Sequence, residues 1–260
     1  MSTRLSTSTS TVRAPQATWI LAVAEMRLMT REWAAMVFAF AFPVLLMLIL
    51  AGVFGTEPSE EYGGATPDDY YVADYVAVPL GALALIGLPV MVAGYRERGV
   101  LRRFASAGVP VGVVLAAQAL VTVVLVVLGA TAVLAVAAPV YGVPAIQRPG
   151  MVLVGLALGT VVMLGIGLVL GMLARTTRSA QALGLLAFFP MWLLGAGGPP
   201  RAVMPEPMQV VSDVLPLGRV SAAIRESWLG TSSIGADLTA LLAWLLIVGV
   251  LTVLARRRLR

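Results

Sequence analysis

The densest group of charged side chains in this sequence lies between two long apolar runs. It consists of Arg96, Glu97, Arg98, Arg102 and Arg103. Guanidinium groups of this kind bind carboxylates, phosphates and acidic protein surfaces. Four arginines so close together cannot remain in hydrocarbon, so the segment must be a polar connection at one face of a membrane. The chemistry that it offers is therefore recognition of another molecule.

The sequence lacks the residue types on which most catalytic and metal sites depend. It contains no histidine and no cysteine, and all eighteen basic residues are arginine. Serine–histidine and cysteine–histidine nucleophiles, thiol chemistry and the usual zinc sites are thereby excluded. Without lysine there is also no phosphate-binding loop ending in Gly-Lys-Ser/Thr. We predict no catalytic residue, no metal site and no cofactor bound by this chain.

The composition indicates an integral membrane protein. Of the 260 residues, 59% are hydrophobic and 12% are charged, against roughly 25% charged residues in soluble proteins. Six apolar segments have the ~20 residues that are needed to cross a hydrocarbon core of about 30 Å. They cover residues 34–54, 76–94, 111–137, 151–174, 180–198 and 238–255. We predict an all-α membrane protein with six transmembrane helices.

The arginines also orient the chain, because positive residues are enriched in cytoplasmic loops. If the N-terminus is cytoplasmic, fourteen of the eighteen arginines lie on that side, including those of a basic tail at residues 256–260. Only Arg148, Arg201, Arg219 and Arg225 lie outside. We therefore expect both termini to be cytoplasmic. This placement makes the arginines topology signals and argues against a nucleic-acid partner.

Two segments at the N-terminus precede the first span. Residues 1–18 are predicted to be a disordered cytoplasmic tail, because their first part is rich in serine and threonine. Residues 19–33 are predicted to form an amphipathic helix with Trp19 and Trp33 on its apolar side and arginines opposite. Such a helix suits the headgroup layer of a membrane, although an ordinary cytoplasmic helix remains the alternative.

Two connections on the outer side are longer than simple turns. Residues 55–75 are acidic, and we expect them to be solvated with their tyrosines at the membrane interface. Residues 199–237 contain five prolines and two apolar pieces that are too short to span. We expect short extracellular helices there, packed at the outer face or dipping into it, which burial within the protein permits.

The six predicted spans contain no ionisable side chain, which argues against an ion-coupled carrier. The fourth span contains the glycine pairs Gly155 and Gly159, and Gly167 and Gly171, each pair one helical turn apart. Small residues with this spacing allow close helix contact. The contact could lie within one subunit or between two.

Residues 96–108, if helical, place apolar and basic side chains on different sides. Val100, Leu101 and Phe104 share one arc, and the arginines lie opposite. Glu97 falls near the apolar arc, where it could pair locally or face a partner. Pro110 ends the helix. A topology-setting loop needs the arginines but not the apolar arc, so a docking role is favoured over a topology signal alone.

This segment resembles a motif of type 2 ATP-binding-cassette exporter permeases, in particular the daunorubicin-resistance-like drug-export permeases of bacteria. The family motif runs Arg-Glu-x-Gly-Thr-Leu-(basic)-(basic)…Thr-Pro-Val. Here the chain reads Arg96-Glu97-Arg98-Gly99-Val100-Leu101-Arg102-Arg103 and then Ala107-Gly108-Val109-Pro110-Val111. It departs from the motif at Val100, where threonine is usual, and at Gly108 and Val109. Later pieces are similar to the family pattern after the fifth span: Gly195-Ala196-Gly197-Gly198-Pro199, Met204-Pro205 and Leu215-Pro216-Leu217.

The resemblance implies a transport subunit without its own ATPase site, in a bacterial inner membrane. Its partners would be two copies of a cytoplasmic ATPase subunit, which holds ATP and Mg²⁺, and a second permease subunit in a homodimer or heterodimer. The cargo would be a drug, an antibiotic or a lipid-like molecule, moved outward between the two permeases. Ion-coupled transport and a membrane scaffold or immunity protein remain the alternatives.

The resemblance also assigns roles to particular residues. A coupling helix that docks on the ATPase would be formed by Arg96, Glu97, Arg98, Gly99, Val100, Leu101, Arg102, Arg103 and Phe104. Spans two and five would line the transport path, with bends supplied by Pro79, Pro89 and Pro190. An outer gate would include Pro199, Pro205, Pro216 and Leu217.

Overall fold

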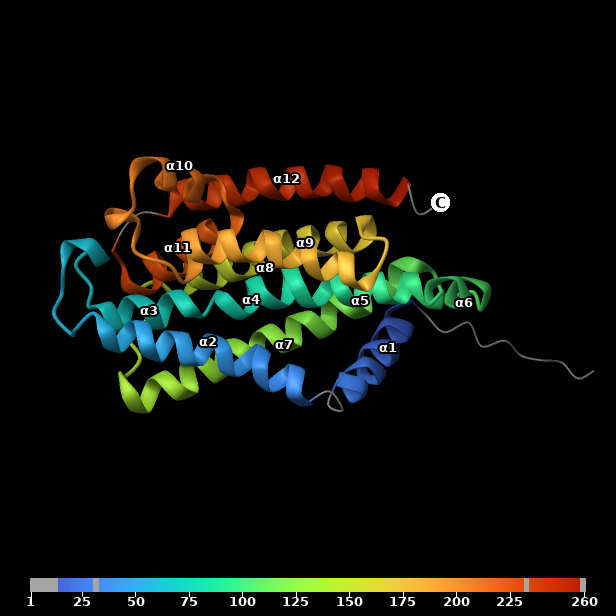
Figure 1. The fold of residues 1–260 in the computed structure, drawn as a ribbon, viewed down its shortest axis with the longest axis horizontal. Helices are drawn as coiled ribbons and strands as arrows, with labels where there is room; N and C mark the ends of the chain where they lie inside the picture. Colours follow the sequence, from blue (N-terminus) through green and yellow to red (C-terminus); the bar gives the residue numbers. More distant parts are fainter. Residues whose placement is uncertain (1–13, 30–32, 232–233, 258–260) are drawn as a thin grey trace, which may run out of the picture.

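The computed structural model describes residues 14–29, 33–231 and 234–257, and every regular element in them is a helix. The long helices run side by side along one axis (Figure 1). The prediction of an all-α membrane protein is thereby confirmed. The α-helices are α1 (Ala14–Met29), α2 (Trp33–Val53), α3 (Pro67–Tyr75), α4 (Val78–Ala82), α5 (Leu88–Glu97), α6 (Val100–Ser106), α7 (Val111–Val140), α8 (Pro149–Leu173), α9 (Thr177–Met191), α10 (Glu206–Val214), α11 (Pro216–Leu229) and α12 (Gly235–Arg257).

Four short elements interrupt or connect these helices. Two are 3₁₀ turns, η1 (Glu60–Tyr62) and η4 (Arg201–Val203). The other two, η2 (Leu83–Gly87) and η3 (Trp192–Ala196), are π-helical turns within the second and fifth predicted spans.

Five helical stretches among the described residues are long and apolar enough to cross a membrane: Glu60–Glu97, Val111–Val140, Pro149–Leu173, Thr177–Ala196 and Gly235–Ala255. Phe40–Val53, within α2, is a shorter apolar stretch. Each of the six predicted spans overlaps one of these segments. Residues 1–13 of the predicted tail and residues 30–32 lie outside the described residues. Helix α1 begins at Ala14, so residues 14–18 of that tail are helical.

The predicted bend sites adjoin the interruptions of the two spans. Pro79 and Pro89 lie in the first turns of α4 and α5, on either side of η2. Pro190 lies within α9, just before η3. A proline has no amide hydrogen to donate, which favours such a break in the helical hydrogen-bond pattern.

Glycines of α8 and α9 pack directly against the backbone of η2. A Cβ atom on Gly167 would clash with the carbonyl oxygen of Ala84, and one on Gly184 would clash with that of Leu85. The backbone of the π turn is thus in direct contact with the backbones of α8 and α9. Only glycine provides this space, which explains why the fourth span is rich in it.

The remaining glycines of the two predicted pairs also face other parts of the same chain. A Cβ on Gly159 would lie 2.6 Å from Val220 of α11, and one on Gly155 would lie 3.3 Å from the side chain of Ala223. A Cβ on Gly171 would lie 2.8 Å from Val92 of α5. The glycine pairs therefore serve packing within the subunit.

Helices α10 and α11 form a hairpin that is inserted beside α12 and α8. The Trp244 indole nitrogen donates a hydrogen bond to the Val214 carbonyl at the tip of the hairpin, over 2.9 Å. Because α12 begins at Gly235 and an α-helix rises 1.5 Å per residue, the tip lies about 13 Å along α12 from its start. Helix α11 thus dips into the bundle, whereas α10 has no buried residue and lies at its surface.

The acidic connection is more buried than the sequence predicts. Tyr62, Tyr70, Tyr71 and Tyr75 are buried, and their rings contact one another in largely edge-to-face pairs. Asp74 is fully buried as well. The expectation of a solvated connection is therefore wrong for α3, because aromatic packing draws this helix into the bundle. A buried carboxylate thus lies inside the helical stretch Glu60–Glu97, two residues before the second predicted span begins.

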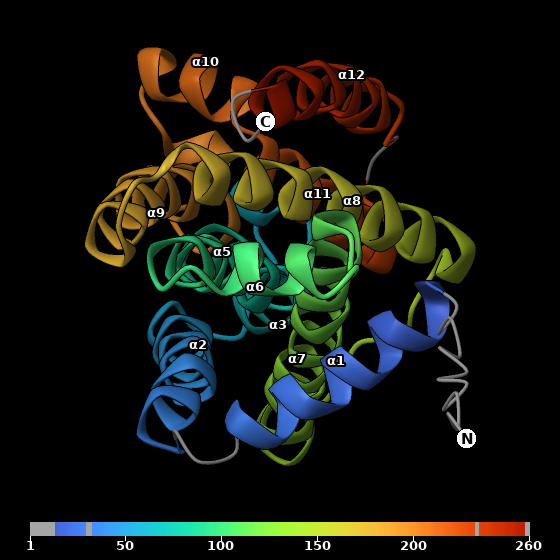
Figure 2. The ribbon, with the colours of Figure 1, turned by 90° about the vertical axis from the view of Figure 1, so that its right-hand side faces the viewer.

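The two ends of the bundle differ in composition. Helices α1 and α6 and the end of α12 lie together at one end, which we call the α6 end (Figures 1 and 2). Helix α10 and the connection that follows α2 lie at the opposite end, which we call the α10 end (Figure 1). Among the described residues, the arginines of the segment 96–103 therefore lie at the α6 end.

Candidate functional site

The predicted coupling segment folds as two helices joined by a tight turn. Helix α5 ends at Glu97, and Gly99 has a φ of +68°, in the left-handed region that favours glycine. Helix α6 then begins at Val100. The single helix that the sequence predicts from Arg96 is wrong in this respect, because the Gly99 conformation interrupts it. Gly108, with φ +80°, and Pro110 separate α6 from α7 in the same way.

Arg96 and Glu97 bind the neighbouring helices. The Arg96 guanidinium donates hydrogen bonds to the carbonyl oxygens of Met172 and Ala174, over 2.7 and 3.3 Å, at the end of α8. A Glu97 carboxylate oxygen accepts hydrogen bonds from the backbone nitrogen and hydroxyl of Thr177, over 2.8 and 2.5 Å. A cation at a helix C-terminus and an anion at a helix N-terminus both suit the helix dipole. We call these two residues the Arg96–Glu97 clamp.

Helix α6 itself remains open to a partner. Its apolar side chains Val100, Leu101 and Phe104 are only partly buried, and no residue of α6 is buried. Arg102 and Arg103 are exposed. Within α6 the apolar side chains are therefore less exposed than the arginines, as the sequence predicts. The clamp residues instead bind other helices of the bundle.

Helix α1 joins the same end of the bundle. Its Ala22 packs with Ala117 and Val121 of α7 in a small apolar cluster. Glu25 lies beside Gln118 of α7, and burial raises the pKa of its carboxyl group, opposed by that glutamine and by Arg98. The N-terminal helix thus packs on α7, and its Glu25 lies within the electrostatic influence of Arg98 in the connection that leads into α6.

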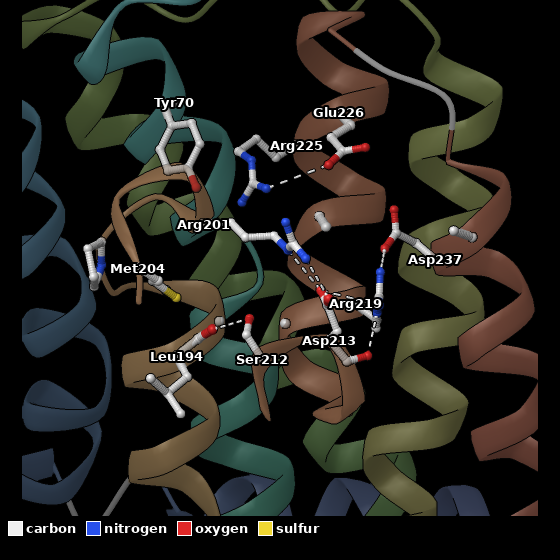
Figure 3. A pocket seen from close by; sticks show the side chains of 15 residues that line it. Tyr70, Leu194, Arg201, Met204, Ser212, Asp213, Arg219, Arg225, Glu226 and Asp237 are labelled. Atoms are coloured by element: carbon white, nitrogen blue, oxygen red, sulfur yellow. Dashed lines mark hydrogen bonds and ion pairs between the residues drawn. The ribbon is translucent and has the colours of Figure 1, made fainter. Parts of the chain in front are cut away.

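A second candidate site, which the sequence did not predict, lies at the α10 end. It is a cavity of about 310 Å³ that contains three arginines and three carboxylates in its wall (Figure 3). The charged lining residues are Arg201, Asp213, Arg219, Arg225, Glu226 and Asp237. They come from η4, α10, α11 and α12, which the hairpin brings together.

Ion pairs connect most of these side chains. Arg201 binds both carboxylate oxygens of Asp213, over 3.0 and 2.6 Å. Arg219 lies 3.4 Å from the same carboxylate and donates to Asp237 over 2.9 Å. The hydrogen bonds from Arg201 hold the pKa of Asp213 below its usual value. We call this series, Arg201–Asp213–Arg219–Asp237, the ion-pair chain.

Another ion pair anchors α11 to α3. Arg225 donates to the buried Asp74 carboxylate, which also accepts from Ser221, and the guanidinium lies 4.4 Å from the centre of the Tyr70 ring. No local signal in the sequence pairs these two residues, because α11 also carries Arg219 and Glu226 and the connection before the second span carries several other acidic residues.

The predicted gate residues do not form one cluster. Pro199 is exposed and lines the cavity, and Pro205 is exposed at the start of α10. Pro216 and Leu217 are buried at the start of α11. A Cβ on Gly81 of α4 would lie 2.6 Å from Leu217, so this leucine sits deep in the bundle.

A comparison with known protein families identifies the class of membrane protein to which the chain belongs. No curated protein matches the sequence significantly. A family model described as ABC-2 type transporter matches residues 16–228, from α1 to the end of α11. The match covers well over half of the chain and includes both candidate sites except for α12. The chain therefore belongs to the ABC-2 type transporter family, whose members are membrane permeases that work with an ATP-binding subunit.

Proposed function

We propose that this chain is the permease of an ATP-driven exporter and that α6 is the helix on which a cytoplasmic ATPase docks. The observation that carries the proposal is the contrast between α6 and the clamp beside it. Val100, Leu101 and Phe104 are left partly exposed at the arginine-rich end of the bundle, whereas Arg96 and Glu97 are fixed to α8 and α9.

The arrangement provides a route for a conformational signal. A displacement of α6 acts on α5 and α7, which flank it in the chain. The clamp then carries the displacement from α5 to the end of α8 and the start of α9. ATP bound between two ATPase subunits would thus move several spans together. ATP and Mg²⁺ remain on the ATPase, and this chain contributes no catalytic group.

The proposed topology places the α6 end in the cytoplasm of a bacterial cell, together with both termini. The transport path then lies between this permease and a second one. An apolar membrane interior suits a hydrophobic or amphipathic cargo such as a drug, an antibiotic or a lipid-like molecule. The daunorubicin-like resemblance of the α6 segment supports export as the direction.

Charge substitutions on α6 test the docking role. We expect Leu101→Glu and Phe104→Glu to abolish co-purification of the partner ATPase, because a carboxylate would be desolvated in an apolar contact. ATP-dependent transport should be lost with it. Ser106→Glu is the matched control, since it adds the same charge to the opposite side of α6, where Ser106 is exposed.

The control should retain the ATPase and most of the transport activity. Equal loss in all three variants would contradict docking through the apolar arc. Transport of cargo by the purified chain alone, in vesicles without any ATPase, would contradict the proposed function as a whole.

A further inference from the structure

Helix α11 is held on two sides by arginines that point to different elements. Arg225 binds Asp74 of α3, and Arg219 binds Asp237 of α12 and Asp213 of α10. Helix α11 also packs against η3 through its backbone. A Cβ on Gly195 of η3 would lie only 2.6 Å from the Cα of Gly218 of α11. It is therefore joined to α3, α12 and η3 of the bundle, and α10 is the part of the hairpin that lies outermost.

The ion-pair chain passes from water into the protein. The Arg201 side chain is 57% exposed, that of Arg219 is 22% exposed and that of Asp237 is 6% exposed. Water can replace the hydrogen bonds of the exposed pair when it separates, but it cannot do so for the buried pairs. The pair that separates at the lowest cost is therefore Arg201–Asp213.

We propose that Arg201 and Asp213 form a latch that closes the cavity at the α10 end, while Arg225–Asp74 and Arg219–Asp237 fix α11 in place. Opening consists of the separation of η4 from α10, with α11 unmoved. Helix α10 stays with α11 in this movement, because Arg219 donates to the Asp213 carbonyl over 2.7 Å and Ser212 donates to the Leu194 carbonyl of η3. The claim that the latch opens during export rests on the proposed function. The claim that the latch closes the cavity does not.

The absence of cysteine from the sequence makes the latch accessible to a direct measurement. Ala222 lines the cavity and is partly buried, so Ala222→Cys places one thiol there. The rate of labelling by a bulky, charged maleimide, measured on the full chain in lipid nanodiscs, then reports how often the cavity is open. Nanodiscs leave both ends in water, so the measurement requires neither the ATPase nor a known orientation.

We expect Arg201→Gln and Asp213→Asn each to raise the labelling rate about fivefold, the population change that corresponds to loss of a single exposed ion pair. Arg201→Lys should give an intermediate rate, since it retains the charge and loses the two-point contact with Asp213. The matched control is Glu206→Gln, which removes an exposed carboxylate from α10 outside the ion-pair chain.

A thermal unfolding curve for each variant separates a latch from a general loss of structure. The proposal requires faster labelling with a melting temperature close to that of the parent. Unchanged labelling in Arg201→Gln and Asp213→Asn would overturn it, as would an equal increase in Glu206→Gln. If the ATPase failed to bind while the latch variants behaved as expected, the proposed function would fall and the latch would stand.

Discussion

At the scale of single residues, the pair Asp74–Arg225 shows how a charge is kept inside this bundle. Burial of an ion pair costs several kcal/mol per ion unless other groups satisfy the remaining hydrogen bonds. Here Ser221 and Arg225 donate to one carboxylate oxygen and the face of Tyr70 lies against the guanidinium, whereas the second carboxylate oxygen has no hydrogen-bond partner among the described residues. Such a site tolerates removal of both charges better than removal of one.

We therefore expect Asp74→Asn to destabilise the protein by about 3–5 kcal/mol, because it leaves Arg225 buried without its counter-charge. The double variant Asp74→Asn with Arg225→Met should recover part of this loss. Thermal unfolding of the purified protein in detergent measures both. Glu61→Gln, on an exposed residue of the same connection, is the control and should change little.

Recovery is the decisive result. If the double variant were less stable than Asp74→Asn alone, Arg225 would have a stabilising role that does not depend on Asp74. The ion pair would then not be what holds α11 against α3.

The clamp and the buried pair also show which single residues the sequence could predict. Arg96 and Glu97 are recognisable in the sequence because they lie in a dense charged segment, and a local partner for Glu97 is one of the two alternatives that the sequence offers. Asp74 was hidden because its neighbours are equally acidic, and only the fold distinguishes it from Asp68 and Asp69. A buried charge of this kind requires knowledge of which helices meet.

At the scale of elements, the π turn η2 depends on glycines in two other helices. Helix α8 provides Gly167 and helix α9 provides Gly184, and each lies against a backbone carbonyl of the turn. The contact is between backbones, so neither side can withdraw by a change of side-chain rotamer. An added methyl group must move a helix.

We expect Gly184→Ala to destabilise the protein by about 1–3 kcal/mol, the usual cost of an overpacked site. Gly249→Ala is the matched control, because an added Cβ at Gly249 of α12 meets nothing within 4 Å. It should be neutral or slightly stabilising, since alanine favours helix more than glycine does. Equal melting temperatures for the two variants would show that α9 adapts to the methyl group.

Apolar length was enough to place the spans, but not the elements that interrupt them. A run of about 20 apolar residues has few alternatives to a membrane helix, so the overlap with the six predicted segments is understandable. The depth of the α10–α11 hairpin and the π turns depend on contacts between distant segments, such as Trp244 with Val214. Those contacts leave no local periodicity in the sequence. The helix break at Gly99 does have a local signal, since glycine favours a helix end, but the prediction of one helix through this residue gave the amphipathic pattern more weight.

At the scale of the whole molecule, the two ends carry different kinds of charge. The α6 end carries exposed arginines beside partly exposed apolar side chains, whereas the three arginines of the cavity wall at the α10 end are each paired with a carboxylate. Arginine placement argues that the α6 end is the cytoplasmic one.

Single cysteines test this orientation in cells. Ser106→Cys on α6 and Ala202→Cys on η4 are both at exposed positions. We expect a membrane-impermeant maleimide added to spheroplasts to label Ala202→Cys at least about tenfold faster than Ser106→Cys, because only one face of the membrane is accessible. Permeabilised cells, in which both should react, are the control, and the reverse order would mean an inverted chain.

The clamp and the π turn together give the second span the form of a lever. Helix α5 is one arm of this lever, and hydrogen bonds of Arg96 and Glu97 attach it to the end of α8 and the start of α9. Helix α4 is the other arm, and η2 separates it from α5. The carbonyl groups of η2 contact glycines of α8 and α9. A force applied at α6 would therefore be diverted sideways into α8 and α9 instead of being transmitted straight along the span, with η2 as the fulcrum.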